Sequence, residues 1–362
     1  MVASSEGLVT FAVVGGGWRS RFYLRVAQAL PDRFCCVGMV VRDPQKGLSQ
    51  ERAFGVTTHR TLDALLAACS PTFVVTSVPW AANPGLVGEL VDRGQWVLSE
   101  TPPAPDLDGL RALWSHVGET GRVQVAEQYI YQPRHAARLE VARSGMLGTV
   151  TQAQVSAAHG YHGVSLVRHY LGIGYEDVAI RAREWSAPLV AGPGRDGPPT
   201  EERLGTSTQT LAWLDWGERF GVFDFTGDQY FSWVRSERVL LRGERGEVNN
   251  AEVRWLPRFD EPAMATLRRE TAGAGGNLEG MYLKGFLLGP RWVYRNPLAP
   301  GRLADDEIAV GTVMLRMAEY VHGGGAPYPL AEACQDHYLS LLINEAARTG
   351  EVVRSERQPW AA

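Results

Sequence analysis

The first third of the chain alternates short apolar runs with amphipathic stretches. The runs "LVTFAVV", "CCVGMVV", "TFVVTSVP" and "QWVLSE" predict buried strands. The stretches "RFYLRVAQAL", "TLDALLAA" and "NPGLVGELVDRG" predict helices, and the last of them ends in glycine, a usual C-terminal cap. "RDPQKG" is expected to close the second strand. This alternation, which continues to about Val125, predicts a parallel sheet with helices on both faces.

Beyond Val125 the pattern changes. "TVTQAQVSAAHGYHG" predicts an alternating strand and "VSLVRHYLG" a short helix. The pattern of successive strands separated by turns recurs in "TSTQTLAWLDWG", "RFGVFDFTG", "QYFSWVRSE" and "RVLLRGERGEVNN". Surface loops are predicted for "APLVAGPGRDGPP" and "TAGAGGNLEG", and amphipathic helices for "DDEIAVGTVMLRMAEYVHGG" and "LAEACQDHYLSLLINEAARTG". The second half therefore suits a mainly antiparallel sheet with one exposed or partner-covered face.

Composition narrows the class of protein. The chain has 362 residues, 45% of them hydrophobic and 21% charged, which is typical of a folded globular protein of one large or two ordinary domains. The net charge of −4 and the absence of a polybasic block argue against a nucleic-acid partner. No apolar run is long enough for a membrane span and no cleavable leader is evident, so a cytoplasmic location is expected. The cysteines match no zinc or redox motif, and we expect free thiols and no metal.

A glycine loop follows the first predicted strand. Its sequence is "GGGWRS", and the dinucleotide fingerprint asks for glycine at the first and third positions and a small residue at the sixth. Gly15 and Gly17 fit, and Ser20 is small enough for close packing. Trp18 and Arg19 lie between them, where the following helix begins and its amide groups can hold phosphate. The loop predicts nucleotide binding, against the alternative of a turn that merely joins strand and helix.

The end of the second predicted strand bears on the choice of cofactor. An acidic residue there binds the ribose 2′-hydroxyl of NAD, whereas an arginine accommodates the 2′-phosphate of NADP. Here Val41 stands at the expected strand end and Arg42 follows, with Asp43 as the acidic candidate if the register is different. We therefore expect NAD(P) and lean to NADP, with a solvated Arg42 as the alternative.

With these features the chain resembles the Gfo/Idh/MocA family of NAD(P)-dependent oxidoreductases. The landmarks, in order along nearly the whole chain, are "GGGWRS", "SETPPAP", "VAEQYIYQP", "SGMLGTV", "YHGVSLVRHYLG" and "LINEAARTG". The resemblance implies a Rossmann domain and an α/β domain with a large open sheet that commonly mediates oligomer contacts. It also implies sugar, cyclitol or polyol substrates. We place the two domains at 1–125 and 126–362, with the C-terminal helices able to pack back on the first, and expect a homo-oligomer through the second.

Two residues depart from the family pattern. Its fourth strand ends in Glu-Lys-Pro, and the lysine assists proton transfer; here Glu100 and Pro102 match, but Thr101 replaces the lysine. A threonine hydroxyl can hydrogen-bond but supplies no cation. The family's other catalytic segment reads Asp-x-Gly-x-His, and aligning it puts His162 at the histidine and Ala158 at the aspartate. The resemblance therefore implies an oxidoreductase with altered proton chemistry.

Several residues are candidates for that chemistry. Histidine can exchange the alcohol proton near neutral pH, which makes His162 the leading catalytic residue. In a continuous strand His159 and Tyr161 would share one face and His162 the other, unless the strand breaks at Gly160. Arg168 could bind an anionic substrate, although a structural salt bridge is the preferred interpretation. The predicted site residues are, for catalysis, His162, His159, Tyr161 and Thr101; for the cofactor, Gly15, Gly17, Trp18, Arg19, Ser20, Arg42, Glu100 and Pro102; and for the substrate, Gln128, Tyr131 and Arg168.

The leading functional hypothesis is an NAD(P)-dependent oxidoreductase that acts on a sugar, a cyclitol or a related small polyol. Because the lysine is missing, imine reduction and redox-assisted glycoside cleavage stay open as enzymatic alternatives. A third alternative is a regulator that senses a sugar or nucleotide without catalysis, since loss of the lysine and aspartate would accompany such a change of role.

Overall fold

The protein is described from a computed structural model, which covers residues 7–273, 275–276 and 280–361. Its contacts divide the chain into two compact units. Unit 1 runs to Pro133 and also includes Arg269–Gly285 and Arg295–Cys334. Unit 2 comprises Arg134–Arg268, Phe286–Tyr294 and Gln335–Ala362. The chain therefore passes between the two units several times.

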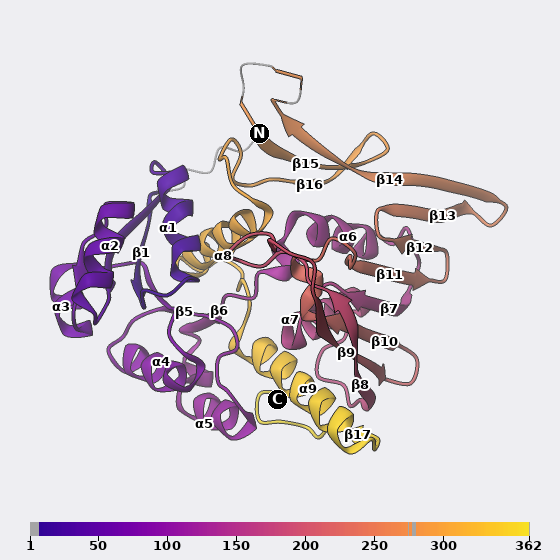
Figure 1. The fold of residues 1–362 in the computed structure, drawn as a ribbon, viewed down its shortest axis with the longest axis horizontal. Helices are drawn as coiled ribbons and strands as arrows, with labels where there is room; N and C mark the ends of the chain where they lie inside the picture. The colour runs from indigo at the N-terminus through magenta and orange to yellow at the C-terminus, as the bar shows by residue number, and fades with distance from the viewer. Residues whose placement is uncertain (1–6, 274, 277–279, 362) are drawn as a thin grey trace. The chain divides into compact units, whose positions relative to one another are not determined.

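Unit 1 is built on a parallel sheet, as predicted (Figure 1). Its strand order, among the described residues, is β3-β2-β1-β4-β5-β6. The strands are β1 Val9–Val14, β2 Phe34–Val40, β3 Thr58–His59, β4 Phe73–Thr76, β5 Val97–Ser99 and β6 Val123–Val125. Val14 at the end of β1 pairs with Val40 on one side and Thr76 on the other, so the carboxyl ends of these strands lie level. The order reverses between β1 and β4, which is where a doubly wound sheet binds its ligand.

Helices cover the sheet of unit 1. They are α1 Ser20–Ala29, α2 Pro44–Phe54, α3 Leu62–Ala68, α4 Asn83–Asp92, α5 Leu107–Val117 and α8 Asp305–Val321, with short 3-10 turns η1 Trp80–Ala82, η2 Gly118–Thr120 and η3 Tyr129–Tyr131. The predicted helix near the end of the chain is thus confirmed as α8, and its buried Val313 and Met314 join the core that contains Phe11 of β1. α2 replaces the turn expected from "RDPQKG", because Asp43 accepts hydrogen bonds from the N–H groups of Gln45 and Lys46 and so caps a helix that starts at a proline.

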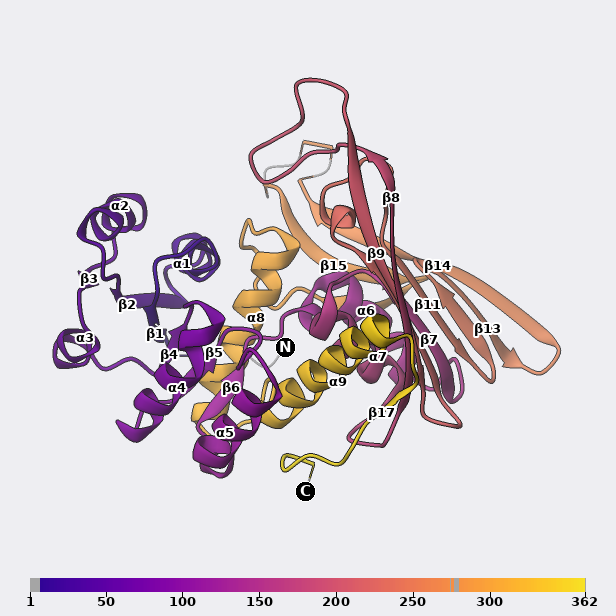
Figure 2. The same cartoon turned by 60° about the horizontal axis from the view of Figure 1, so that its bottom comes forward.

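A second, larger sheet carries most of unit 2 and is mainly antiparallel, as predicted (Figure 2). In the described part of the chain its strand order is β16-β15-β14-β13-β12-β11-β7-β10-β9-β8-β17. The strands are β7 Val150–Ser156, β8 Ala179–Val190, β9 Leu204–Asp215, β10 Phe220–Thr226, β11 Arg238–Gly243, β12 Gly246–Asn249, β13 Glu252–Arg258, β14 Glu261–Ala272, β15 Tyr282–Leu288, β16 Arg291–Arg295 and β17 Val353–Arg354. β7 and β10 are an internal parallel pair, and α7 Gly160–Leu171 packs on both. The remaining helices are α6 Pro133–Arg143 and α9 Leu330–Thr349.

Two predicted strands are wrong in part. The strand expected over "TVTQAQVSAAHGYHG" ends at Ser156, and α7 begins at Gly160, which has a positive φ of 41°. The side chains of His159, Tyr161 and His162 therefore do not alternate across a sheet. The strand expected over "QYFSWVRSE" is the 3-10 turn η4 Gly227–Tyr230 followed by a turn, because Thr226 and Gln229 form a capping box that curls the chain.

The predicted loops have mixed outcomes. The first four residues of "APLVAGPGRDGPP" extend β8, and the rest of that stretch joins β8 to β9. In "TAGAGGNLEG", residues 274 and 277–279 lie outside the described part of the chain.

Candidate functional site

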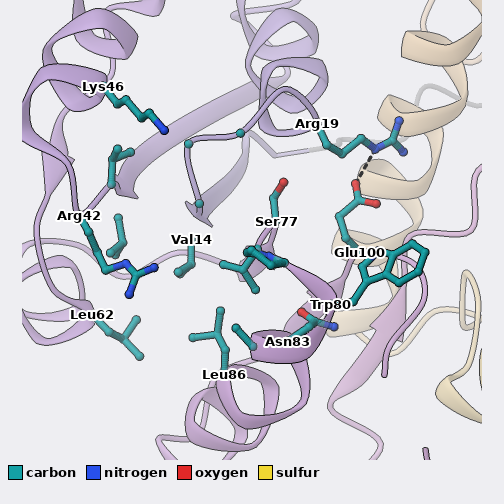
Figure 3. Close-up of a pocket in the computed structure, with 18 of the residues that line it drawn as sticks. Val14, Arg19, Arg42, Lys46, Leu62, Ser77, Trp80, Asn83, Leu86 and Glu100 are labelled. Atoms are coloured by element: carbon teal, nitrogen blue, oxygen red, sulfur yellow. Dashed lines mark hydrogen bonds and ion pairs between the residues drawn. The ribbon is translucent and has the colours of Figure 1, made fainter. Parts of the chain in front are cut away.

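A pocket of about 900 Å³ lies in unit 1 at the carboxyl ends of β1, β2, β4 and β5 (Figure 3). Its floor is the end of β1 and the glycine loop, and its sides come from the segments that follow the other three strands. Seven of the eight predicted cofactor residues line it: Gly15, Gly17, Trp18, Arg19, Arg42, Glu100 and Pro102. Lys46, from the first turn of α2, lines it as well. The predicted catalytic residue Thr101 lines it as well.

The glycine loop provides bare backbone at the centre of this pocket. Gly15 has a φ of +123°, and a Cβ there would lie 2.0 Å from the carbonyl oxygen of Ser77. A Cβ on Gly17 would meet nothing within 4 Å and would occupy open pocket space. Ser20, which does not line the pocket, is buried and donates a hydrogen bond from Oγ to Gly17 O at 2.6 Å. The loop is thus fixed from below and leaves room above for a pyrophosphate at the start of α1.

The end of the pocket next to β2 is basic. Arg42 and Lys46 are exposed and point into the pocket (Figure 3), and within the described residues neither makes a side-chain hydrogen bond or ion pair. Arg60 is half-buried and donates to Val41 O at 2.8 Å, which places a third cation at the same strand end. Asp43 also lines the pocket, and its Oδ1 accepts the two amides of the α2 cap, which lower the pKa of the carboxyl. The three cations at this end provide positive charge for a phosphate.

The opposite end holds a half-buried ion pair. Glu100 accepts a hydrogen bond from Arg19 Nε at 2.7 Å and from the Tyr23 hydroxyl at 2.5 Å. Burial and then the Glu100 charge raise the pKa of Tyr23, so its hydroxyl remains a donor. Glu100 and Arg19 therefore pair with each other, and this ion pair holds the turn that carries Thr101.

Asn83, at the start of α4, fixes the same turn from below. It accepts a hydrogen bond from Thr76 Oγ1 at 2.6 Å and donates to Ser99 Oγ at 2.8 Å and to Pro103 O at 3.0 Å. The carboxyl ends of β4 and β5 are therefore tied to one another beside Thr101.

In unit 2, His159, Tyr161, His162, Tyr230 and His337 gather into what we call the histidine–tyrosine cluster. The ring of His159 lies 4.9 Å from that of His162 and 5.2 Å from that of Tyr161, measured between centroids. His159 Nδ1 is 2.6 Å from the Tyr230 hydroxyl, and its Nε2 is 3.4 Å from the Tyr161 hydroxyl. His337 packs edge-on against Tyr161 at 5.5 Å.

The members of the cluster differ in exposure. His162 is 4% exposed, whereas His159, the N-cap of α7, is exposed. Although part of the side chain reaches solvent, the His159 ring is packed against the rings of Tyr161, His162 and Tyr230, and this partial desolvation, followed by the charge of His162, lowers the pKa of His159 to about 3. His159 is therefore a neutral imidazole throughout the physiological range.

Comparison with known proteins identifies the fold and the family. Residues 9–128 match the family model described as "Oxidoreductase family, NAD-binding Rossmann fold", GFO_IDH_MocA. Residues 9–128 therefore form a Rossmann domain of the Gfo/Idh/MocA type. The match covers the part of the chain that forms the dinucleotide pocket, and a domain of this family binds NAD there. No curated protein sequence matches the chain.

Solved structures share the fold of this chain over almost its whole length. Levoglucosan dehydrogenase in complex with NADH and levoglucosan is 14% identical, with 96% of this chain and 99% of that one covered and a TM-score of 0.68. GenD2 from gentamicin A biosynthesis, in complex with NAD, is 18% identical, with 98% of each chain covered and a TM-score of 0.65. The WlbA dehydrogenase from Bordetella pertussis, in complex with NADH and UDP-GlcNAcA, is 16% identical, with 96% and 98% covered and a TM-score of 0.61.

The predicted substrate residues lie outside the lining of this pocket. Gln128 is buried, and its Oε1 has no hydrogen-bond partner among the described residues. Tyr131 donates its hydroxyl proton to Pro327 O at 2.6 Å. Arg168 is fully buried in unit 2, where it binds Asp336 at 2.6 Å and Gly174 O at 2.6 Å. This arrangement of Arg168 favours the structural salt bridge over binding of an anionic substrate.

The sequence analysis missed several residues of the two sites. Lys46 follows Arg42 by four positions, and recognising Asp43-Pro44 as a helix start would have placed both cations together. Tyr230 was assigned to a strand, and nothing in its local pattern pairs it with His159. Among residues 7–273, 275–276 and 280–361, no cluster of metal-binding side chains and no helix able to cross a membrane are found.

Proposed function

We propose that this protein catalyses hydride transfer between NADP and a hydroxyl-bearing carbon of a sugar, cyclitol or related small polyol. The observation that carries the proposal is the pocket of unit 1, whose bare glycine loop and basic β2 end fit the two phosphate-bearing parts of a dinucleotide. Support for the substrate class comes from the structural neighbours, which include a dehydrogenase bound to levoglucosan and another bound to UDP-GlcNAcA. Residues 126–362 are proposed to hold the substrate.

The bound nicotinamide would supply the hydride acceptor or donor. When a secondary alcohol is oxidised, the carbon loses a hydride, the hydroxyl loses a proton, and a carbonyl group remains. His162 is proposed to accept that proton, since Thr101 provides no cationic group and Ala158 no carboxylate. The Thr101 hydroxyl is proposed to hydrogen-bond the reacting oxygen, and Tyr161, whose ring centroid is 4.4 Å from that of His162, orients it.

Substitution of His162 tests the proton step. His162→Ala is expected to lower kcat by about 10²- to 10⁴-fold in an assay of NADPH formation with a panel of polyols. His116→Ala is the control, because His116 is a surface histidine of α5 that pairs with Asp92 at 3.0 Å. Wild-type activity in His162→Ala would remove His162 from the mechanism.

The cofactor preference has its own test. Arg42→Ala is expected to weaken NADPH binding by about 10- to 100-fold while changing NADH binding less than about twofold, because a guanidinium–phosphate hydrogen bond contributes ~1.5–3 kcal/mol. The matched control is Arg52→Ala, which removes an exposed arginine from the last turn of α2, the helix that follows Arg42, outside the pocket. Tighter binding of NADH than of NADPH by the wild type, measured by fluorescence titration, would reject the NADP preference.

The threonine at position 101 favours imine reduction as a second candidate function. An imine needs a single proton on nitrogen, which a histidine or tyrosine of the cluster can supply without a lysine. Consumption of NADPH with cyclic imines and none with polyols would select this candidate. Cleavage of a glycoside without net change in NADPH would instead select redox-assisted glycoside chemistry.

The open sheet is proposed to join copies of this chain into a homo-oligomer. Large apolar side chains on its strands are exposed, among them Trp185 of β8, Trp213 of β9 and Met264 of β14. A monomer mass in light scattering at micromolar concentration would reject this proposal.

A further inference from the structure

The turn η4 presses one hydroxyl against the exposed histidine of the cluster. Gln229 donates its amide N–H groups to Ser156 O at 3.0 Å and to Ser236 O at 2.9 Å, and its Oε1 accepts the Thr226 N–H at 3.0 Å. These bonds fasten η4 to the end of β7. Tyr230, the last residue of η4, is thereby held beside the N-cap of α7.

Two contacts of the Tyr230 hydroxyl define which nitrogen of His159 carries the proton. The backbone N–H of His159, which can only donate, points to the Tyr230 hydroxyl oxygen at 3.1 Å. The hydroxyl oxygen has a second lone pair, so this contact alone leaves the phenol proton unassigned. The 2.6 Å between the hydroxyl oxygen and His159 Nδ1 is shorter than the ~2.7–3.2 Å of an N–H···O bond, which favours the phenol as the donor and Nδ1 as the acceptor. A neutral imidazole carries one proton, and a nitrogen that accepts a hydrogen bond cannot carry it. If Nδ1 is the acceptor, the proton is therefore on Nε2.

We propose that Tyr230 is a positioning residue that holds His159 as the neutral Nε2–H tautomer, so that His159 donates a hydrogen bond to the reacting oxygen of the substrate. The role of His159 as a donor to substrate rests on the proposed function, whereas the tautomer itself does not. Part of the His159 side chain reaches solvent, and the packing of its ring against the neighbouring aromatic rings lowers its pKa and keeps it uncharged.

This assignment separates the roles of the two histidines. A neutral Nε2–H imidazole with so low a pKa is a poor base, but it is a preorganised donor toward an oxygen that gains negative charge. His159 would therefore stabilise the alkoxide-like oxygen while His162 exchanges the proton. A neutral N–H dipole here takes the place of the lysine cation. Because His159 only donates a hydrogen bond and transfers no proton, it does not have to be reprotonated in each turnover.

The tautomer can be observed directly. In protein labelled with ¹⁵N-histidine, at pH 7 and without substrate, His159 is expected to show a pyridine-type Nδ1 and a protonated Nε2 in long-range ¹H–¹⁵N spectra, assigned by loss of the signals in His159→Gln. Tyr230→Phe is expected to shift His159 toward a mixture of tautomers. The opposite pattern in the wild type, with the proton on Nδ1, would overturn the proposal.

A second tyrosine–histidine pair supplies the matched control. The Tyr170 hydroxyl lies 3.0 Å from His135 Nδ1 in the buried part of unit 2. Tyr170→Phe should change the His135 signals and leave the tautomer of His159 and the value of kcat as in the wild type. A change in the His159 signals of this variant equal to that in Tyr230→Phe would show a general loss of structure and reject the specific role of Tyr230.

Kinetics connect the tautomer with turnover. Tyr230→Phe is expected to lower kcat by about tenfold or more with KM nearly unchanged, because the lost interaction strengthens only as the oxygen becomes charged. His159→Gln, whose amide can still donate, should retain more activity than His159→Ala. An unchanged kcat in Tyr230→Phe, with the tautomer shifted, would reject the link to turnover; absence of turnover in the wild type with every substrate would reject the proposed function and leave the tautomer assignment standing.

Discussion

Replacing Gly15 with alanine is expected to abolish dinucleotide binding and to destabilise unit 1. The added Cβ would lie 2.0 Å from Ser77 O, and Gly15 has a φ of +123°, which an L-residue rarely adopts. Neither side can move alone, because the Gly15 N–H donates to Val40 O at 3.0 Å and the Ser77 N–H donates to Val14 O at 2.8 Å. The collision therefore forces the ends of β1 and β4 apart, at a cost of about 3 kcal/mol. Thermal denaturation of the ligand-free protein and NADPH titration measure the two effects.

Gly17→Ala separates binding from folding. Its Cβ would meet nothing within 4 Å, so the ligand-free variant should melt close to the wild type. The same methyl group would stand where the pyrophosphate approaches the loop, and NADPH affinity is expected to fall by about tenfold or more. Wild-type affinity in Gly17→Ala would place the pyrophosphate elsewhere. Wild-type melting of Gly15→Ala would show that the contact with Ser77 relaxes without cost.

The parallel sheet of unit 1 could be predicted because each of its main strands leaves a signal within its own short stretch of sequence. Strands buried on both faces read as continuous apolar runs, and β1, β2, β4 and β5 do so. α2 was missed because Asp43-Pro44 is a turn signal as well as a helix start, and the decision between them depends on whether the carboxylate finds the amides that follow.

The cluster of unit 2 could be predicted only in part, because it is made by tertiary contacts. His159, Tyr161 and His162 are neighbours in sequence and lie together in the structure, but the break at Gly160 changes which of their side chains point together. Tyr230 comes from a segment about seventy residues away, and its contact with His159 depends on the pairing of β10 with β7, because η4 follows β10. The environment of Arg168 could not be predicted either. Its ion-pair partner Asp336 is buried and lies far away in the sequence, so the local pattern around Arg168 does not indicate it.

Glu127→Gln is expected to stabilise unit 1 at alkaline pH. Glu127 is 2% exposed and lies after β6, and burial raises the pKa of its carboxyl to about 8, against the opposing effects of the Tyr129 N–H and of Arg19. Ionisation of this group in the folded protein therefore takes place in an environment that solvates a charge poorly. Glutamine keeps an oxygen for the Tyr129 N–H, 2.9 Å from the present acceptor, and carries no charge.

The direction of the pH effect follows from the proton balance. Between the ordinary pKa of 4.5 and the folded value of about 8, the native protein holds a proton that the unfolded chain has released. The free energy of unfolding of the wild type therefore falls as pH rises through this interval, by up to about 1.4 kcal/mol per pH unit for one proton. The advantage of Glu127→Gln is expected to grow between these two values, to at most about 5 kcal/mol, and to stay constant above pH 8.

Urea denaturation of the wild type and the variant at several values between pH 5 and pH 9 measures this difference. Glu119→Gln removes an exposed carboxylate from the same unit and should give a nearly constant difference from the wild type over the range. Parallel stability curves for Glu127→Gln and the wild type would show that Glu127 titrates in the folded state as it does in water. We expect the free energies of unfolding of the wild type and of Glu127→Gln to diverge from about pH 5 to about pH 8. Because the two proteins differ only at this residue, that result would assign the loss of stability in this pH range to the ionisation of the Glu127 carboxyl.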